Sequence, residues 1–183
     1  MFEKLPVRSE GVVFDVGGFH GEWTAEMTWR YGCRSVVFEP IPAFMAVLEA
    51  KFGLNERIAL VKAGLAARDC TLRMRFAEDS SSVFGPMDGT SIECEMKGVE
   101  EAFREYGLFD VACMKLNIEG AEFDVLDEML RQGLQERVSC FLIQFHDVGP
   151  QSGARRDTIR AALRASHRND YDFPFVWERW TRR

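Results

Sequence analysis

Short apolar runs alternate with helix-like segments over residues 12–61, and this order constrains the fold more than any other feature of the chain. Each apolar run has the length of a buried strand, and the segments between the runs have apolar side chains at helical spacing. The expected strands cover 12–16, 35–39 and 58–61, and the expected helices cover 22–31 and 42–52. Strands joined by helices pair in parallel and are covered on both faces. The sequence therefore predicts a Rossmann-like α/β fold.

The rest of the chain continues this alternation. Residues 71–76 alternate apolar side chains with arginines, which predicts a half-exposed strand at an edge, and residues 79–89 are expected to form a loop. Further helices are expected at 96–106, 121–130 and 155–166, and further strands at 111–116, 138–145 and 173–180. We predict one domain of 183 residues, with a mostly parallel sheet, helices on both faces and an antiparallel C-terminal strand.

Charge and cysteine content limit the partners and the compartment. The net charge of −6 and the pI near 5.2 argue against a nucleic-acid-binding protein, which usually carries a clustered excess of Lys and Arg. The five cysteines are scattered singly, as in proteins of a reducing compartment. Residues 1–9 lack the apolar core of a signal peptide, and no window resembles a membrane span. We expect a cytoplasmic protein that binds neither nucleic acid nor membrane.

Residues 110–126 form the segment that points most directly to a function. An apolar run there carries Lys115 and then breaks into a polar turn with Asn117 and Glu119. Burying such groups is costly unless they face a ligand, a cavity or one another. Because ligands of parallel α/β sheets bind at the carboxyl ends of the strands, the end of this strand is predicted to be an active site.

The same segment resembles the signature of the FkbM family of S-adenosylmethionine-dependent methyltransferases, Lys-Ile-Asp-x-Glu-Gly-x-Glu. Residues 115–122 read Lys-Leu-Asn-Ile-Glu-Gly-Ala-Glu, so Asn117 stands at the family's aspartate and lacks its negative charge. Residues 38–40, Phe-Glu-Pro, match a second family motif, and the resemblance extends from Val12 to about Asp147. It implies a class I methyltransferase fold and S-adenosylmethionine as the cofactor.

The turn after the first strand favours this cofactor on chemical grounds. Its glycines let the backbone approach a ligand, but a dinucleotide fingerprint would need glycines at Phe19 and Glu22. Asp15 would repel a pyrophosphate, whereas S-adenosylmethionine carries an ammonium and a sulfonium. Glu39, at the end of the second strand, is placed to bind the ribose diol, and the resemblance puts residues 63–65 beside the adenine. The expected cofactor-binding residues are Asp15, Gly17, Gly18, Phe19, Gly21, Glu39, Pro40, Gly64, Leu65 and Asn117.

His146, Glu119 and Lys115 are the candidates for catalysis. Methyl transfer to a hydroxyl needs in-line geometry and a base for the acceptor proton. We prefer His146, because its unperturbed pKa suits this role, whereas Glu119 would need burial to raise its own pKa. His146 could equally orient Asp147 or a backbone carbonyl. Lys115 is more readily explained as a strut to Glu119 or Glu122 than as a proton donor. A divalent cation such as magnesium stays undecided.

The resemblance implies O-methylation of a glycan, a polyketide or another small hydroxylated acceptor. The first expected strand begins at residue 12, which leaves little room for an N-terminal lid, so the acceptor is expected to meet internal loops or a second subunit of a homodimer. Trp177 and Trp180 could stack on a sugar or close the cofactor pocket. Two alternatives stay open. One is a protein that binds the cofactor but does not turn over, which is suggested by Asn117 in place of the family's aspartate. The other is a nucleotide-dependent dehydrogenase, which Asp15 and the missing glycines of the first turn disfavour.

Overall fold

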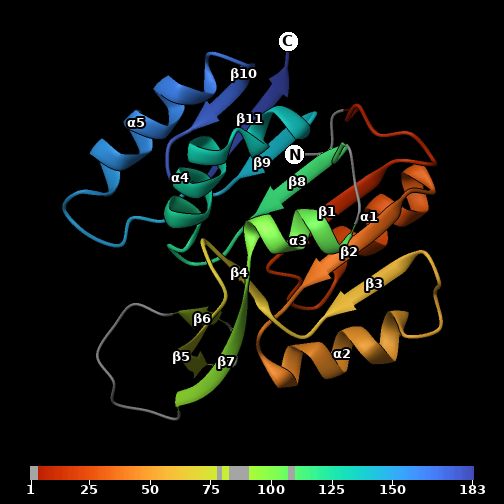
Figure 1. The fold of residues 1–183 in the computed structure, drawn as a ribbon. Coiled ribbons are helices and arrows are strands. Elements are labelled where there is room, and N and C mark those ends of the chain that lie inside the picture. The colour runs from red at the N-terminus through yellow and green to blue at the C-terminus, as the bar shows by residue number, and fades with distance from the viewer. Residues whose placement is uncertain (1–3, 78–79, 83–90, 107–109) are drawn as a thin grey trace.

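The computed structural model describes residues 4–77, 80–82, 91–106 and 110–183. Seven strands form the main sheet in the order β3-β2-β1-β8-β9-β11-β10 (Figure 1). They are β1 (Val12–Val16), β2 (Arg34–Phe38), β3 (Ile58–Val61), β8 (Cys113–Leu116), β9 (Cys140–Ile143), β10 (His167–Phe173) and β11 (Trp177–Arg182). β1, β2, β3, β8 and β9 pair in parallel, and β11 lies antiparallel between β9 and β10. The predicted parallel sheet with an antiparallel C-terminal strand is confirmed.

Helices cover both faces of the main sheet. They are α1 (Glu22–Tyr31), α2 (Pro42–Phe52), α3 (Val99–Glu105), α4 (Glu122–Gln132) and α5 (Ser152–Leu163), with a 3₁₀ helix, η1 (Leu134–Arg137). On one face Val13 packs with Met27 of α1, and Val37 packs with Leu48 of α2. On the other face Phe14 belongs to the largest core cluster, which includes residues of α3, α4 and α5. Successive residues of β1 therefore point to opposite faces of the sheet, as the pleat of a strand requires. None of the helices in the described ranges has the length and apolar character that a membrane span requires.

A second sheet adjoins the carboxyl end of β2. Its strands are β4 (Gly64–Ala66), β5 (Cys70–Ala77), β6 (Ser80–Ser82) and β7 (Ser91–Gly98), in the order β4-β7-β5-β6. Met74 and Cys94 of this sheet pack against Ile41 and Phe44, which follow β2. The loop expected at 79–89 contains β6, and its positions 79 and 83–89 lie outside the described residues.

Three predicted elements need correction. Residues 96–98 end β7 instead of opening a helix, since apolar and charged side chains alternate over 92–97 as in a strand. The strand predicted at 71–76 is not at an edge, because β5 pairs with β6 on one side and β7 on the other. The single strand predicted at 173–180 is wrong, because β10 and β11 form an antiparallel hairpin there.

Candidate functional site

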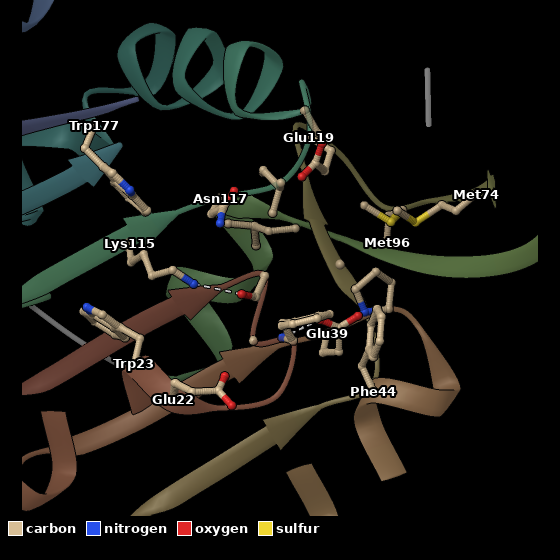
Figure 2. A pocket seen from close by; sticks show the side chains of 18 of the residues that line it. Glu22, Trp23, Glu39, Phe44, Met74, Met96, Lys115, Asn117, Glu119 and Trp177 are labelled. Atoms are coloured by element: carbon tan, nitrogen blue, oxygen red, sulfur yellow. Dashed lines mark hydrogen bonds between the residues drawn. The ribbon is translucent and has the colours of Figure 1, made fainter. Parts of the chain in front are cut away.

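A cavity of about 440 Å³ opens where β1, β2 and β8 end (Figure 2). Most of the residues expected to bind the cofactor or take part in catalysis line it: Gly17, Gly18, Phe19, Glu39, Pro40, Gly64, Leu65, Lys115, Asn117 and Glu119. Asp15, Gly21 and His146 lie outside this lining. Parallel strands end at one edge of a sheet, which explains why residues distant in sequence meet at this point.

Glu39 is a buried carboxylate that the backbone holds in place beside the cavity. It is 4% exposed, and its Oε2 accepts the Phe19 N–H at 2.8 Å while Oε1 accepts the Ile41 N–H at 2.9 Å. Burial raises the pKa of Glu39 above its ordinary value, and the two backbone hydrogen bonds oppose that rise. A carboxylate has about four acceptor positions, so each oxygen keeps one for a ligand.

Lys115 forms a buried ion pair with Asp15, its direct neighbour across β8 and β1. Its Nζ donates to Asp15 Oδ1 at 2.7 Å and to the Gly17 carbonyl at 2.8 Å. The second oxygen of Asp15 accepts the Thr24 hydroxyl at 2.6 Å. Lys115 therefore pairs with the first strand, and not with the carboxylates of 119–122 as the sequence suggested. Because an ammonium has three donors, one is left for the cavity.

The glycines of the first turn make room mainly for neighbouring protein atoms. Gly17 has a φ of +87°, and a Cβ built on it would lie 2.2 Å from the backbone oxygen of Asn117. Gly21 has a φ of +82°, and its Cβ would lie 2.4 Å from the ring of Phe52. Gly17 thus lets the ends of β1 and β8 approach, and Gly21 lets α2 approach. These contacts account for both glycines without a ligand.

The turn between β8 and α4 directs polar groups at the cavity. Glu119 and Gly120 have φ values of +53° and +107°. A positive φ at a non-glycine residue is unfavourable and is often found at functional sites. The Glu119 side chain lines the cavity, as does that of Asn117. Asn117 Oδ1 is buried and finds no hydrogen-bond partner among the described residues, so it could accept a hydrogen bond from a bound ligand.

His146 follows β9 and lies behind Glu119. Its backbone N–H donates to Glu122 Oε1 at 2.7 Å, and its ring Nδ1 is 3.1 Å from the same oxygen. Its Nε2 is 3.5 Å from Glu119 Oε1. Burial lowers the pKa of His146, but the hydrogen bond that its ring donates to Glu122 and the charges of both glutamates outweigh burial, so the pKa is raised. Glu122, rather than Asp147 or a carbonyl, orients this histidine.

The two ends of the cavity contain residues that the sequence motifs did not include. Figure 2 shows Trp23 and Trp177 near Lys115 at one end, and Met74 and Met96 at the other. The Lys115 Nζ lies 5.9 Å from the centroid of the Trp23 ring, within cation–π range. Trp23, Met74 and Met96 carried only an apolar signal in the sequence. Trp177 was a candidate and lines the cavity, whereas Trp180 is fully buried in the core.

Carboxylates dominate the charge of the cavity. Glu22, Glu26, Glu39 and Glu119 line it, and Lys115 is the one basic side chain among its described lining residues. Such a lining favours a ligand that carries positive charge and has one anionic group. Across the described part of the chain, no group of three His, Cys, Asp or Glu side chains is arranged to hold a metal ion.

Comparison with known proteins identifies a family. The family model described as the Methyltransferase FkbM domain matches residues 15–173 of this chain. The matched range includes Asp15, the first turn, Glu39, the whole of β8 and the turn that follows it. A comparison with curated protein sequences gave no match.

Several solved methyltransferase structures share the fold. Methyltransferase FkbM from Methylobacillus flagellatus superposes with a TM-score of 0.62 at 14% identity, over 97% of this chain and 44% of that one. Aeropyrum pernix fibrillarin with natively bound S-adenosyl-L-methionine gives 0.56 at 11% identity, over 100% and 70%. M. capricolum TrmK with S-adenosyl-homocysteine gives 0.54 at 8% identity, over 96% and 64%. The present chain thus spans less than half of the first of these proteins, and identities this low show the fold alone.

Proposed function

Because the chain belongs to the FkbM methyltransferase family, we propose that it transfers the methyl group of S-adenosylmethionine to a hydroxyl oxygen of a glycan, a polyketide or a similar small acceptor. One observation carries the cofactor assignment. Glu39 faces the cavity with both oxygens fixed by backbone N–H groups and with one acceptor position free on each. A carboxylate held in this way can accept both hydroxyls of a ribose diol.

The charges of the cavity match the amino-acid part of the same cofactor. The third donor of Lys115 supplies the site for the cofactor's carboxylate. Asn117 Oδ1 is an acceptor for its ammonium, and the surrounding glutamates favour the two cationic groups. Because Asp15 is fully buried and outside the cavity lining, we assign it an indirect role, in which it holds Lys115 in place.

The other end of the cavity provides an apolar site for the adenine. Leu65, which is fully buried, lines the cavity together with Met74, Met96 and Phe44. The absence of a side chain at Gly64 lets Met96 pack against the backbone there, since a Cβ at Gly64 would lie 2.5 Å from Met96 Cε. An apolar slot of this kind takes a planar base between aliphatic and sulfur-containing side chains.

The protein's part in the reaction is to position the acceptor and remove its proton. When bound, the cofactor supplies an activated methyl group that is transferred in line. Glu119 lines the cavity and is placed to take the acceptor proton, with His146 behind it. We therefore assign the contact with the acceptor to Glu119, although the sequence alone favoured His146. We assign Lys115 to cofactor binding and not to proton transfer, because Asp15 and the Gly17 carbonyl hold its ammonium.

The polar and aromatic lining of the cavity favours a neutral or cationic acceptor. The lining of the cavity includes Glu22 and Glu26 as well as Trp23 and Trp177. Carboxylates repel phosphates, and indole rings stack on the apolar faces of sugars. These features and the net charge of −6 support a small hydroxylated acceptor over nucleic acid. Completion of the acceptor site by a second copy of the chain stays a prediction.

The proposal is tested by incubating the protein with tritiated S-adenosylmethionine and separate pools of neutral sugars, hydroxylated polyketides and RNA. We expect label in a hydroxylated small molecule, and much less label with the Glu39→Ala variant at a limiting cofactor concentration. Label in RNA would contradict the acceptor class. If the protein binds S-adenosylhomocysteine but labels no pool, it is a binding module without turnover, and the proposed enzymatic function is wrong.

A further inference from the structure

Three side chains form a row that leads from the cavity into the protein. Glu119 lines the cavity, and its Oε1 lies 3.5 Å from His146 Nε2. The other ring nitrogen, Nδ1, lies 3.1 Å from Oε1 of Glu122. The three residues come from the turn after β8, the segment after β9 and the first turn of α4. The imidazole therefore has one carboxylate at each nitrogen.

Glu122 is more deeply buried, and accepts more hydrogen bonds, than its position in the first turn of a helix requires. It is fully buried, and its Oε2 accepts the Gly120 N–H at 2.8 Å while Oε1 accepts the backbone N–H of His146. An acid in the first turn interacts favourably with the helix dipole at the surface as well. Asp124, in the same turn, does so with a side chain that is 67% exposed. The dipole therefore does not account for the burial of Glu122.

The contact with Glu122 determines which nitrogen of His146 is free. An ionised carboxylate only accepts hydrogen bonds, so the proton of neutral His146 lies on Nδ1. This leaves the lone pair of Nε2 facing Glu119. A carboxylate behind a histidine fixes its tautomer and stabilises its charged form in the same way in other hydrolytic and transfer enzymes.

We propose that Glu122 is a positioning residue, which holds His146 in the tautomer that can receive the acceptor proton from Glu119. This inference rests on the proposed methyl transfer. The acceptor O–H bond breaks, its proton passes to the Glu119 carboxylate, and the oxygen's electron pair forms the bond to the methyl carbon. The S–CH₃ bond breaks with its electron pair kept by sulfur. Glu119 then passes the proton to Nε2, and the imidazolium lies between two carboxylates.

Electrostatics support this order of groups. The pKa of His146 is raised despite burial, and the groups that raise it are Glu122, from α4, and Glu119, from the preceding turn. The charged histidine is thus stabilised where the proton would arrive. The 3.5 Å between Nε2 and Glu119 is longer than a hydrogen bond, as is common before a substrate closes the site.

The test is ¹⁵N NMR of the imidazole rings in the full chain, which needs no acceptor. The chain has three histidines, and a His146→Asn variant assigns the signal. We expect neutral His146 to carry its proton on Nδ1 and to titrate at a pH above that of an unperturbed histidine. In Glu122→Gln the titration midpoint should move to lower pH. Asp124→Asn removes one charge from the same helical turn and should leave the midpoint unchanged.

A neutral form protonated on Nε2 would overturn the proposal, and so would an equal effect of the Glu122 and Asp124 substitutions. If Glu122→Gln does not fold, Glu119→Gln tests the cavity-facing half of the row. That variant should also lower the midpoint while the proton stays on Nδ1, and an unchanged midpoint would contradict the row. Binding of S-adenosylhomocysteine to the wild type is measured in parallel. A lack of S-adenosylhomocysteine binding would count against the proposed function. The NMR result tests the arrangement of Glu119, His146 and Glu122 independently of that function.

Discussion

At the residue scale, the cavity contains carboxylates that the backbone holds and carboxylates that face solvent. Glu39 is 4% exposed, and each of its oxygens accepts a backbone N–H. The side chain of Glu22 also lines the cavity but is 69% exposed. A preoriented group loses little freedom on binding, so Glu39 should contribute more to affinity than Glu22.

Glu39→Ala should weaken binding of S-adenosylhomocysteine tenfold or more, because a hydrogen bond to a charged group contributes about 1.5–3 kcal/mol. Glu22→Ala removes the same charge from the same cavity and should have a much smaller effect. Calorimetric titration of both variants makes the comparison. Equal losses of affinity would show that bulk charge, and not the held carboxylate, binds the ligand.

The pH dependence of wild-type binding extends this prediction. Only the ionised carboxylate accepts both hydroxyls of a diol, and burial raises the pKa of Glu39. Affinity should therefore fall as the pH is lowered through this raised pKa, and the fall should begin at a higher pH than an unperturbed glutamate would give. Binding that is independent of pH on the acid side of neutrality would contradict the role of Glu39.

Lys115→Met should weaken binding of S-adenosylhomocysteine and leave binding of methylthioadenosine unchanged, because the second ligand lacks the amino-acid part. The variant also leaves Asp15 buried and unpaired, so the free energy of unfolding should fall by about 3–5 kcal/mol. The double variant Lys115→Met, Asp15→Asn removes both charges and should recover part of that stability. If it also regains full affinity, the ammonium does not bind the carboxylate.

The polar residues of the site could be predicted from the sequence because each follows a strand directly. Glu39 and Asn117 follow β2 and β8, and both line the cavity. The partner of Lys115 could not be predicted, since Asp15 is 100 positions away and only the β1–β8 register makes them neighbours. The role of Glu122 could not be predicted for a similar reason, because its partner His146 lies 24 positions away, in the segment that follows β9.

At the element scale, the approach of two strand ends depends on one glycine. A side chain at Gly17 would meet the Asn117 carbonyl at 2.2 Å, and the φ of +87° is unfavourable for any other residue. Gly133, after α4, has a similar φ of +73°, but a Cβ added to it would have nothing within 4 Å. A comparison of alanine substitutions at the two glycines therefore separates the free-energy cost of the backbone conformation from the cost of the steric collision.

Gly133→Ala should lower the free energy of unfolding by about 1–2 kcal/mol, the usual cost of a left-handed residue. Gly17→Ala should lower it further, and should also weaken binding of S-adenosylhomocysteine because the collision displaces Asn117. Chemical denaturation and calorimetry give the two quantities. Similar losses of stability for the two variants would mean that β1 and β8 do not meet as closely as described.

Elements with strong local signals were predicted closely, and elements that depend on their neighbours were not. The bounds of β1, β3, α1 and α2 match the expected ranges, because turn and cap residues punctuate them. β7 was taken as helix over 96–98, since acidic and apolar residues suit both structures. Pro174, in the turn of the β10–β11 hairpin, was the signal that could have divided the strand expected at 173–180.

At the scale of the whole molecule, the cavity draws on both sheets and on the C-terminal hairpin. Met74 and Met96 come from the second sheet, and Trp177 opens β11. No local pattern relates these residues to Glu39, so the sequence could not place them in one site. The hairpin in turn is tied to α5 through Arg156, which is buried and bonds Glu178 at 2.6 Å as well as Asp172.

Arg156→Met should therefore lower the free energy of unfolding by about 3 kcal/mol, the lower end of the usual cost of breaking a buried ion pair, because Arg160 still contacts Glu178 at 3.1 Å. Arg155→Met, at the preceding position of the same helix, breaks two exposed ion pairs, with Asp124 and Asp127, and should lower it by about 1 kcal/mol or less. Thermal and urea unfolding of the two variants test this difference. Equal losses would mean that the hairpin is not anchored by this ion pair.

The central claim is that the cavity beside Glu39 binds S-adenosylmethionine, and calorimetric titration of the wild type with S-adenosylhomocysteine tests it most directly. NADH serves as the control, since the first turn lacks the glycine pattern of a dinucleotide site and the carboxylates that line the cavity should repel a pyrophosphate. We predict micromolar binding of S-adenosylhomocysteine and no binding of NADH. Binding of NADH, or no binding of S-adenosylhomocysteine by the folded protein, would contradict the account.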